Sequence, residues 1–367
     1  MAKIVYIADV CKEIFAGGDV PKSALSYEKT AEYNVPIFSN GEKDCGLYGY
    51  TNNARVKEPS ITVSARGTIG YTAIRTEPFV PVVRLITLTP KSEVIDLDYL
   101  FYATQNYRFE GSGTSIPQLT VPMLKKYKFQ LPEMSHQKAI AVKFEKLDQL
   151  ISLRKQQLAK LDELVKARFV EMFGDISNGR KVPMQDVCKI ITDGTHQPPK
   201  FVLSGIPFLF VSNIVTNEIH YDAEKFISEE TYNELIKRTP IEVGDVLLST
   251  VGSYGHPAVV KENKPFCFQR HIAYLKPNNS VVNSEYLRCA ILSTDLQRQI
   301  DESVKGIAQK TLNLSEIRKL RLPLPSLSLQ NQFAAFVERV DQQKQTVQQS
   351  LDKLELMKKA LMQEYFG

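Results

Sequence analysis

Four polar side chains flank a Pro-Pro pair in the second half of the chain, within the stretch Asp-Gly-Thr-His-Gln-Pro-Pro-Lys at 193–200. They belong to Thr195, His196, Gln197 and Lys200. Proline fixes the path of a loop, and hydroxyl, imidazole, amide and ammonium groups all hydrogen-bond to base edges or phosphates. The stretch therefore predicts either a rigid loop that contacts nucleic acid or a solvated turn.

Two Gly-x-x-Gly motifs offer a second kind of contact. The first lies in Ser-Ala-Arg-Gly-Thr-Ile-Gly at 64–70, and the second lies in Ser-Thr-Val-Gly-Ser-Tyr-Gly at 249–255. Because glycine has no side chain, backbone N–H groups can approach a phosphate here, although a tight hairpin turn would use the same residues. The neighbours that could take part in such a contact are Arg66, Thr68, Tyr71, Ser253, Tyr254 and His256.

Further hydrogen-bond donors stand beside expected strands. In the second half these are Gln269, Arg270 and His271, and the alternative to a DNA contact is a half-buried Arg270 paired with Glu242 or Glu262. The candidates of the first half are Ser39, Asn40, Asn52, Asn53 and Arg55. All of these side chains can bind nucleic acid, and none of them forms a catalytic set.

Catalytic and metal-binding motifs are not found in the sequence. The chain contains no Gly-Lys dipeptide, which excludes a phosphate-binding loop of the Gly-x-x-x-x-Gly-Lys type. The stretch Gln-Pro-Pro-Lys at 197–200 lacks the aromatic residue with which an amino-methyltransferase stacks an extruded base. The five histidines do not combine with carboxylates or cysteines at ligand spacing. We expect a protein without a catalytic residue, a bound metal or a cofactor.

Composition places the chain among ordinary globular proteins. Its 367 residues suffice for two domains, and 43% of them are hydrophobic. The net charge of +5 is compatible with a nucleic-acid partner but is too small to indicate one by itself. Five cysteines with no Cys-x-x-Cys spacing suggest reduced thiols. The N-terminus has no apolar signal region and no run is long enough to span a membrane, so we expect a cytoplasmic protein.

An internal repeat is the most informative feature of the sequence. Gly113 aligns with Gly306, and at this separation of 306 − 113 = 193 the stretch 113–174 matches 306–367 without a gap. Identical pairs include Leu131/Leu324, Pro132/Pro325, Gln137/Gln330, Asp148/Asp341, Phe173/Phe366 and Gly174/Gly367. Upstream, Asp-Val-Cys-Lys occurs at 9–12 and 186–189, and Gly17 is in step with Gly194. The chain is a tandem duplication, and each copy is a globular part followed by a helix.

The two expected helices have apolar residues at alternating spacings of four and three. The first seam consists of Ile140, Phe144, Leu147, Ile151, Leu158, Leu161 and Val165, with Arg154 as an interruption. The second consists of Phe333, Val337, Val340, Val347, Leu351, Leu354 and Leu361, with Lys344 and Lys358 as interruptions. Each helix of about 36 residues would be ~54 Å long. The pattern predicts that the helices pair in a coiled coil, and the alternative is that each packs only on its own globular part.

The globular parts are expected to be rich in short strands, which makes the fold class α+β. Strands are predicted at 60–65, 82–88, 245–250 and 271–276. One helix is predicted in each part, near 96–106 in the first and over 283–300 in the second.

The sequence resembles a known family over nearly its whole length: the specificity (S) subunit of type I restriction-modification enzymes. In the second half the resemblance rests on the stretches at 193–199, 205–214, 243–255 and 306–332. In the first half it rests on Val-Pro-Ile-Phe-Ser-Asn at 35–40, on the Gly-x-x-Gly motif and on the junction Gln-Leu-Pro-Glu-Met-Ser-His-Gln at 130–137. The first half lacks a counterpart of Asp-Gly-Thr-His.

The resemblance implies two target-recognition domains separated by two long antiparallel helices. These would be recognition domains at 1–132 and 175–325, each followed by a helical region, at 133–174 and 326–367. It implies double-stranded DNA as ligand and two modification (methyltransferase) subunits and restriction (endonuclease and translocase) subunits as partners. S-adenosylmethionine would be bound by the methyltransferase, and the helices would set the spacer between the half-sites.

The duplication supports the same function without the family. A tandem repeat with antiparallel helices has pseudo-twofold symmetry, which suits a duplex with two symmetry-related half-sites. Since fused copies can diverge and the expected loops of the two parts differ, the target should be asymmetric. The alternative function is a non-catalytic scaffold that binds proteins through its paired helices.

Overall fold

The computed structural model describes residues 3–107, 109, 117–174, 181–304 and 310–367. The chain divides into two compact units. Unit 1 comprises Met1–Gln156 together with Gln348–Gly367, and unit 2 comprises Gln157–Val347. The first columns of the repeat, 113–116 and 306–309, lie outside the described residues. Both units mix helices and strands, so the predicted α+β class is confirmed.

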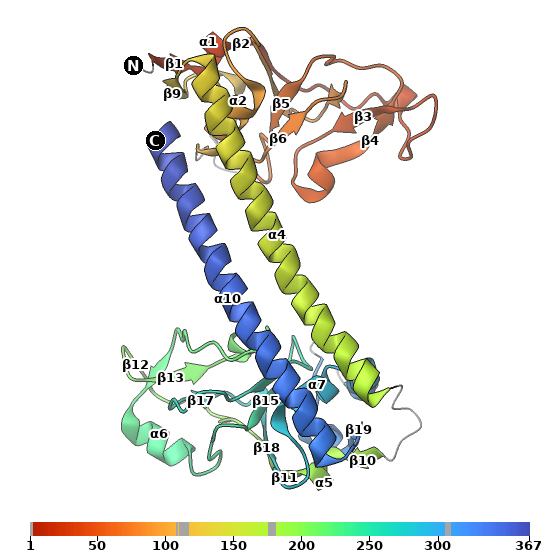
Figure 1. Cartoon of the computed structure of the whole chain (residues 1–367), viewed down its shortest axis with the longest axis vertical. Helices are drawn as coiled ribbons and strands as arrows, with labels where there is room; N and C mark the ends of the chain where they lie inside the picture. Colours follow the sequence, from red (N-terminus) through yellow and green to blue (C-terminus); the bar gives the residue numbers. More distant parts are fainter. Residues whose placement is uncertain (1–2, 108, 110–116, 175–180, 305–309) are drawn as a thin grey trace. The chain divides into compact units, whose positions relative to one another are not determined.

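Unit 1 contains two sheets and a strand pair (Figure 1). A four-stranded sheet has the order β2-β8-β5-β6, formed by Cys11–Ala16, Ile86–Pro90, Ser60–Val63 and Thr72–Arg75. A three-stranded sheet has the order β4-β3-β7, formed by Leu47–Thr51, Val35–Phe38 and Val80–Pro81. The separate pair is β1 (Lys3–Tyr6) with β9 (Lys128–Leu131). The helices are α1 (Ile7–Val10), α2 (Leu97–Gln105), α3 (Val121–Leu124) and the first part of α4 (Met134–Phe173).

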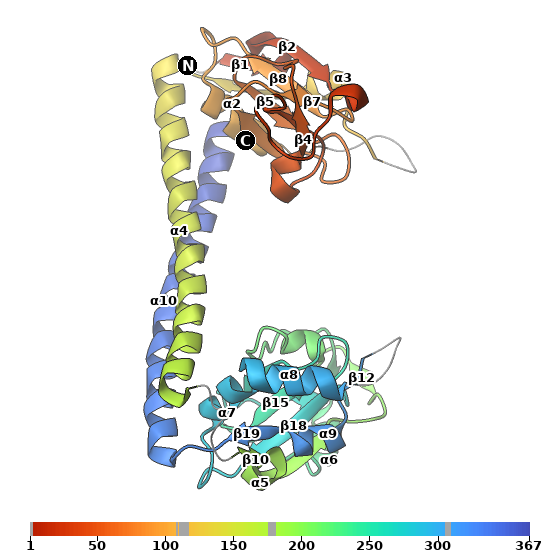
Figure 2. The same ribbon diagram turned by 90° about the vertical axis from the view of Figure 1, so that its right-hand side faces the viewer.

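Unit 2 repeats this arrangement with additions (Figure 2). The sheet β11-β18-β15-β16 consists of Cys188–Asp193, Ile272–Pro277, Val246–Ser249 and Pro257–Val259. The sheet β12-β14-β13-β17 consists of Phe201–Val202, Phe226–Ile227, Ile206–Leu209 and Cys267–Phe268. β10 (Lys181–Pro183) pairs with β19 (Arg321–Pro323). The helices are α5 (Met184–Val187), α6 (Glu229–Leu235), α7 (Ser284–Ile291), α8 (Thr294–Ser303), α9 (Leu314–Lys319) and part of α10 (Leu327–Phe366).

The strand order shows that the duplication extends to the fold. The sheet β2-β8-β5-β6 has the same order and antiparallel pairings as β11-β18-β15-β16. In the second sheet of each unit, β3 runs parallel to β7 and β13 runs parallel to β17. The internal repeat predicted from the sequence is therefore present in the fold of the two units.

Two details of the predicted elements are wrong. The expected strand at 82–88 begins only at Ile86, because Val83 and Arg84 have left-handed backbones (φ 51° and 63°) and form a turn. The expected single helix over 283–300 is two helices, since the side chain of Ser293 accepts a hydrogen bond from the backbone N–H of Leu296 and starts α8. In both places a local turn interrupts a favourable hydrophobic pattern.

In unit 1 the helices α4 and α10 pair antiparallel. Lys358 Nζ lies 2.5 Å from a carboxylate oxygen of Asp148, and Arg154 Nε donates to Ser350 Oγ at 3.2 Å. These two basic residues are interruptions of the apolar seam, so each finds a polar partner on the opposite helix.

Unit 2 holds the other halves of the same two helices, again antiparallel. Lys344, the third interruption of the seam, lies 2.8 Å from Asp162. Each helix has 40 residues, or about 60 Å at ~1.5 Å per residue, and both unit boundaries fall inside these helices. No helix among the described residues has the length and apolarity needed to span a bilayer.

The repeated junction before each helix has a structural reason in one buried glutamine. In unit 1, Gln137 Nε2 donates to the carbonyls of Val94 and Pro132 at 3.1 and 2.9 Å. Its Oε1 accepts from the N–H of Asp96 at 2.8 Å. Only 1% of Gln137 is exposed, so these bonds replace the water that burial removes.

The equivalent Gln330 of unit 2 makes the same three bonds. Its Nε2 donates to Val281 and Pro325 at 3.2 and 2.9 Å, and its Oε1 accepts from the N–H of Asn283 at 2.9 Å. Each glutamine thus ties the start of the long helix to the segment that leads into α2 or α7. The junction is repeated because this connection is made twice.

The Phe-Gly end of each long helix packs on the globular part of the other repeat copy. Phe366 of α10 lies 5.1 Å, centroid to centroid, from Tyr99 in unit 1, and Phe173 of α4 lies 4.9 Å from Tyr286 in unit 2. The apolar cores therefore include both helices in each unit. The structure does not follow the alternative in which each helix packs only on its own globular part.

Candidate nucleic-acid interface

Three polar loops of unit 1 meet at the ends of the sheet strands. The amide of Asn40 joins them: its Oδ1 accepts from the N–H of Ala65 at 2.7 Å, and its Nδ2 donates to the carbonyl of Val83 at 2.6 Å. Ala65 precedes the first Gly-x-x-Gly motif and Val83 lies in the turn before β8. Asn40 is thus a structural clamp at this corner of the unit.

Two arginines converge beside the clamp. Arg66 donates from Nε and NH2 to Gln118 Oε1 at 3.2 and 2.9 Å, and Arg84 NH1 donates to the same oxygen at 3.1 Å. Arg66 is half-buried and Arg84 is exposed. Arg66 is among the candidates predicted from the sequence, whereas Arg84 and Gln118 are not.

The remaining candidates of unit 1 have separate surroundings. Thr68, Asn52 and Asn53 are exposed, whereas Ser39 is half-buried. Arg55 lies 3.5 Å from Glu13 and its guanidinium stands 5.1 Å from the ring centre of Phe15. For Tyr71, burial and then a hydrogen bond with Cys45 raise the pKa of the phenol, which stays protonated near neutral pH. The structure does not bring these residues to one point.

The two Gly-x-x-Gly motifs form tight turns with left-handed glycines. Gly67 and Gly70 have φ values of 68° and 89°, and Gly252 and Gly255 have 72° and 81°. A Cβ atom would meet nothing within 4 Å at Gly67 or Gly252, so the backbone there is open to an approaching ligand. The structure thus combines the two interpretations that the sequence left open, a hairpin turn and an accessible backbone.

The first polar loop of unit 2 is held by a half-buried acid. Asp193, at the end of β11, lies 2.9 Å from His196 Nε2 and 2.5 Å from Arg238 NH2. The hydroxyl of Thr195 donates to the carbonyl of Gln197 at 3.0 Å. His196, Gln197 and Lys200 are exposed. The loop is fixed from within while its outer side chains face solvent, and sequence reasoning missed Arg238.

Three predicted loops of unit 2 also meet. The N–H of Arg270 donates to the carbonyl of Thr195 at 3.0 Å, and the N–H of Thr250 donates to the carbonyl of His271 at 2.9 Å. Thr195 and Gln269 form an isolated parallel bridge. Residues from 195, 250 and 270 are therefore neighbours, although the sequence separates them widely.

The side chains at this corner differ in their partners. Arg270 Nε lies 3.4 Å from His271 Nε2, whereas Glu242 pairs with Lys276 and Glu262 pairs with Lys264. Burial and then the charge of Arg270 lower the pKa of His271, which makes the imidazole neutral at physiological pH.

The second Gly-x-x-Gly turn is tied to its own unit. Tyr254 donates to Asp301 at 3.0 Å, His256 Nδ1 lies 3.3 Å from Asn217 Oδ1, and Ser253 is exposed.

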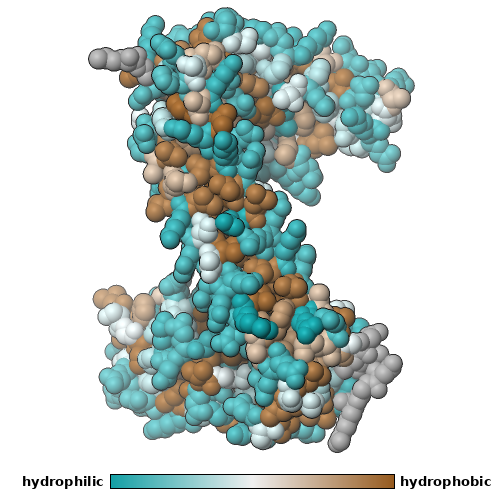
Figure 3. Space-filling model, viewed as in Figure 1, coloured by the Kyte–Doolittle hydropathy of each residue, from teal (hydrophilic) through white to brown (hydrophobic). Residues whose placement is uncertain are grey.

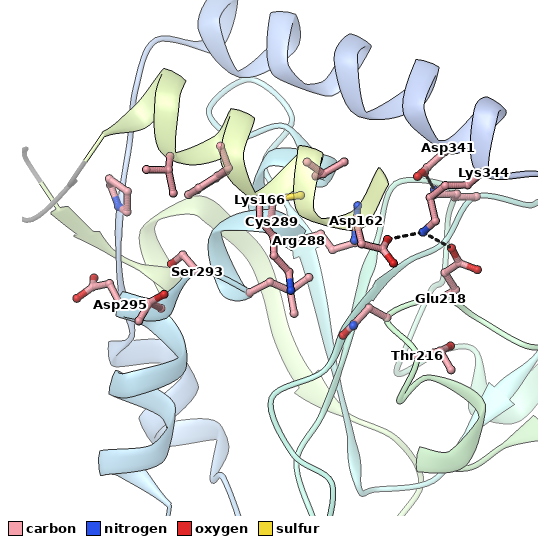
Figure 4. Close-up of a pocket in the computed structure, with 18 of the residues that line it drawn as sticks. Asp162, Lys166, Thr216, Glu218, Arg288, Cys289, Ser293, Asp295, Asp341 and Lys344 are labelled. Atoms are coloured by element: carbon pink, nitrogen blue, oxygen red, sulfur yellow. Dashed lines mark hydrogen bonds and ion pairs between the residues drawn. The ribbon is translucent and has the colours of Figure 1, made fainter. Parts of the chain in front are cut away.

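A cavity of about 670 Å³ in unit 2 lies beside the long helices, and Asn217, which contacts His256, is part of its lining (Figure 4). Its charged groups pair with one another: Lys344 lies 2.8 Å from Asp162 and 3.9 Å from Glu218. Burial raises the pKa of the Cys289 thiol to about 11, so this sulfur is protonated near neutral pH. The described part of the chain holds no group of three or more histidines, cysteines and acids placed to bind a metal.

Comparisons with known proteins agree on one family. The family model for the type I restriction modification DNA specificity domain matches residues 2–163 and 179–356. A type I specificity subunit of Mycoplasma pneumoniae, S.MpnORF507P, is 35% identical over 172 residues, which cover 44% of this chain and 47% of the relative. The chain thus matches about half the length of that relative. The EcoBI specificity subunit of Escherichia coli is 21% identical over 341 residues, covering 84% of this chain and 70% of the relative.

The fold is also found among solved structures. The S subunit of a type I restriction-modification system from M. genitalium superposes with a TM-score of 0.63 at 16% identity, covering 100% of this chain and 96% of that one. At this identity the likeness concerns the fold. The family model, in contrast, matches both copies of the repeat and most of the sequence. The chain therefore belongs to the family of type I restriction-modification DNA specificity proteins.

Proposed function

We propose that this protein is a DNA-reading subunit in which each unit recognises one half of an asymmetric, bipartite target. One observation carries the proposal. Both units build the same sheet and bring three polar loops together at the same end of it, but the side chains on those loops differ. A shared frame with different loops would read two different base sequences, since base edges specify and phosphates position.

The chain itself is proposed to be non-catalytic. Methylation and cleavage would be performed by two modification subunits and by restriction subunits, and S-adenosylmethionine would bind to the modification subunits. Exposed apolar side chains on the long helices support a docking role for them (Figure 3). These are Val142, Leu150, Leu153, Leu356 and Met357 in unit 1 and Leu164 and Val170 in unit 2.

The long helices are proposed to set the spacer between the half-sites. A seven-residue insertion after Gln156 and another after Gln349 would preserve the heptad pattern and lengthen the pair by ~10 Å. This corresponds to ~3 base pairs of duplex and to a rotation of roughly 100° about its axis. We expect weaker binding, a longer preferred spacer and unchanged half-sites. Selection of bound duplexes with the insertion variant tests this, and an unchanged spacer would contradict it.

Binding of random duplex over a series of salt concentrations tests the proposed function. A DNA-reading protein loses affinity steeply as salt rises, because contacts with phosphates release counterions. The purified chain should bind duplex in this way and should transfer no methyl group from S-adenosylmethionine. The alternative, a scaffold that binds only proteins through its helices, predicts partner binding without salt-dependent DNA affinity.

A further inference from the structure

The two converging arginines of unit 1 form an uncompensated cluster of positive charge. Three N–H groups of Arg66 and Arg84 donate to the single oxygen Oε1 of Gln118, at 2.9 to 3.2 Å. An amide oxygen fixes the two guanidinium groups near each other but carries no net charge. Among the described residues, neither arginine has a carboxylate within ion-pairing distance.

The other described arginines of unit 1 do have partners. Arg55 pairs with Glu13, and Arg154 donates to Ser350 of the opposite helix. Arg75 is buried, donates to the carbonyl of Cys45 at 2.6 Å and stands 3.6 Å from the ring centre of Phe38. Arg66 and Arg84 therefore differ from the other described arginines of unit 1 in that two like charges are brought together around one neutral oxygen.

A strained turn holds Arg84 in this place. Val83 and Arg84 both have left-handed backbones, which cost an L-residue about 1–2 kcal/mol and are most unusual for a β-branched valine. Their N–H groups donate to the carbonyls of Gly18 and Gly17 at 2.8 and 2.9 Å. Asn40 Nδ2 donates to the Val83 carbonyl from the other side. The fold sustains strain here, as is common where a side chain must be aimed at a ligand.

We propose that Arg66 and Arg84 together bind one phosphate of the DNA backbone, with Gln118 as the residue that positions them; this rests on the proposed function. Each guanidinium has five N–H donors, so most of them remain available after the bonds to Gln118. Charge-assisted hydrogen bonds from two arginines suit a phosphodiester oxygen pair and relieve the repulsion between the cations. The contact fixes the register of unit 1 on the duplex and carries no sequence information.

The experiment measures affinity of the full-length chain for a random duplex over a salt series. The variants are R66Q, R84Q and the double variant, with R66K and R84K as conservative replacements. The control is R298Q, which removes an exposed arginine that Asp295 and Glu302 already neutralise. Thermal unfolding of each variant shows whether its fold is intact.

We expect each glutamine variant to lose about tenfold in affinity, as for a lost charge-assisted hydrogen bond. Because both arginines bind one phosphate, the double variant should lower the slope of log affinity against log salt by about one, and R84Q should add little to R66Q. The lysine variants should keep the slope and lose less affinity. R298Q should bind like the original protein.

Three results would overturn the proposal. A folded double variant with unchanged affinity and slope would show that the cluster does not contact DNA, while leaving the proposed function intact. A slope lowered by about two would show that the arginines contact separate phosphates. If the unaltered chain bound no duplex at any salt concentration, the proposed function would fail together with this inference.

Discussion

The helix junctions and the polar loops behave differently within the same duplication. The junctions are the same in both units: Gln137 and Gln330 each make three bonds to equivalent backbone groups. At the corner where the loops meet, unit 1 has two arginines on Gln118, whereas unit 2 has Arg270 beside His271. The turn at 82–85 also contains two left-handed residues, whereas the equivalent turn at 269–272 contains none.

This difference separates what the fold requires from what recognition can vary. A buried amide with three partners tolerates no substitute of another shape, because each lost partner becomes a buried unsatisfied group. Exposed loop residues have no such constraint and can diverge without loss of the frame. One architecture can thus present two different loop surfaces, as the proposed function requires.

The largest effect is expected from removal of the junction amides. Q137L and Q330L should each destabilise the protein by about 4 kcal/mol, since several buried backbone groups lose their partner. Urea unfolding measures this, with Q149L and Q342L as controls on exposed helix positions, where changes stay within about 0.5 kcal/mol. If one of the two variants lost much less free energy of unfolding than the other, the two junctions would not be equivalent.

A somewhat smaller effect is expected from the aromatic ends of the helices. F366A should cost about 3 kcal/mol, because Phe366 is 4% exposed and packs on Tyr99 and Phe144. F173A should cost less, since Phe173 is only half-buried. Hydrogen exchange should locate the loss for F366A in unit 1 and for F173A in unit 2. Loss in the opposite units would contradict the exchange of helix ends between the repeat copies.

The smallest effect concerns the strained turn that distinguishes the loops. Asparagine tolerates a left-handed backbone better than valine, so V83N should stabilise the protein by about 1 kcal/mol. Q269N, in the equivalent turn of unit 2, which has no positive φ, should bring no such gain. Thermal unfolding compares the two, and equal changes in both would mean that the turn of unit 1 stores no strain.

The parts of the fold that the sequence predicted are those with a periodic or repeated signal. The heptad seam predicted the long helices, and the 193-residue offset predicted the shared frame. Glycine occurs at both equivalent positions, Gly17 and Gly194, because a Cβ atom at either one would come within 2.6 Å of the backbone that precedes β8 or β18. The break at Ser293 left no periodic signal, since apolar spacing continues through it.

The arginine cluster could not be predicted, because it depends on tertiary contacts. Gln118 lies 52 residues from Arg66 and 34 from Arg84 along the chain. The hydrophobic run around Arg84 favoured a strand, and only the bonds to Gly17 and Gly18 turn it outward. By strand pairing, the residue of unit 2 equivalent to Arg84 is His271.

The most direct test of the central claim is a hybrid protein. Residues 1–132 are replaced by the first recognition domain of another member of the family, and duplexes bound by the hybrid, assembled with the proposed modification subunits, are selected and sequenced. Since each unit has its own core and its own loops, one half of the selected target should change and the other half should stay the same. A hybrid whose two half-sites both changed, or neither, would contradict the claim that each unit reads its own half of the target.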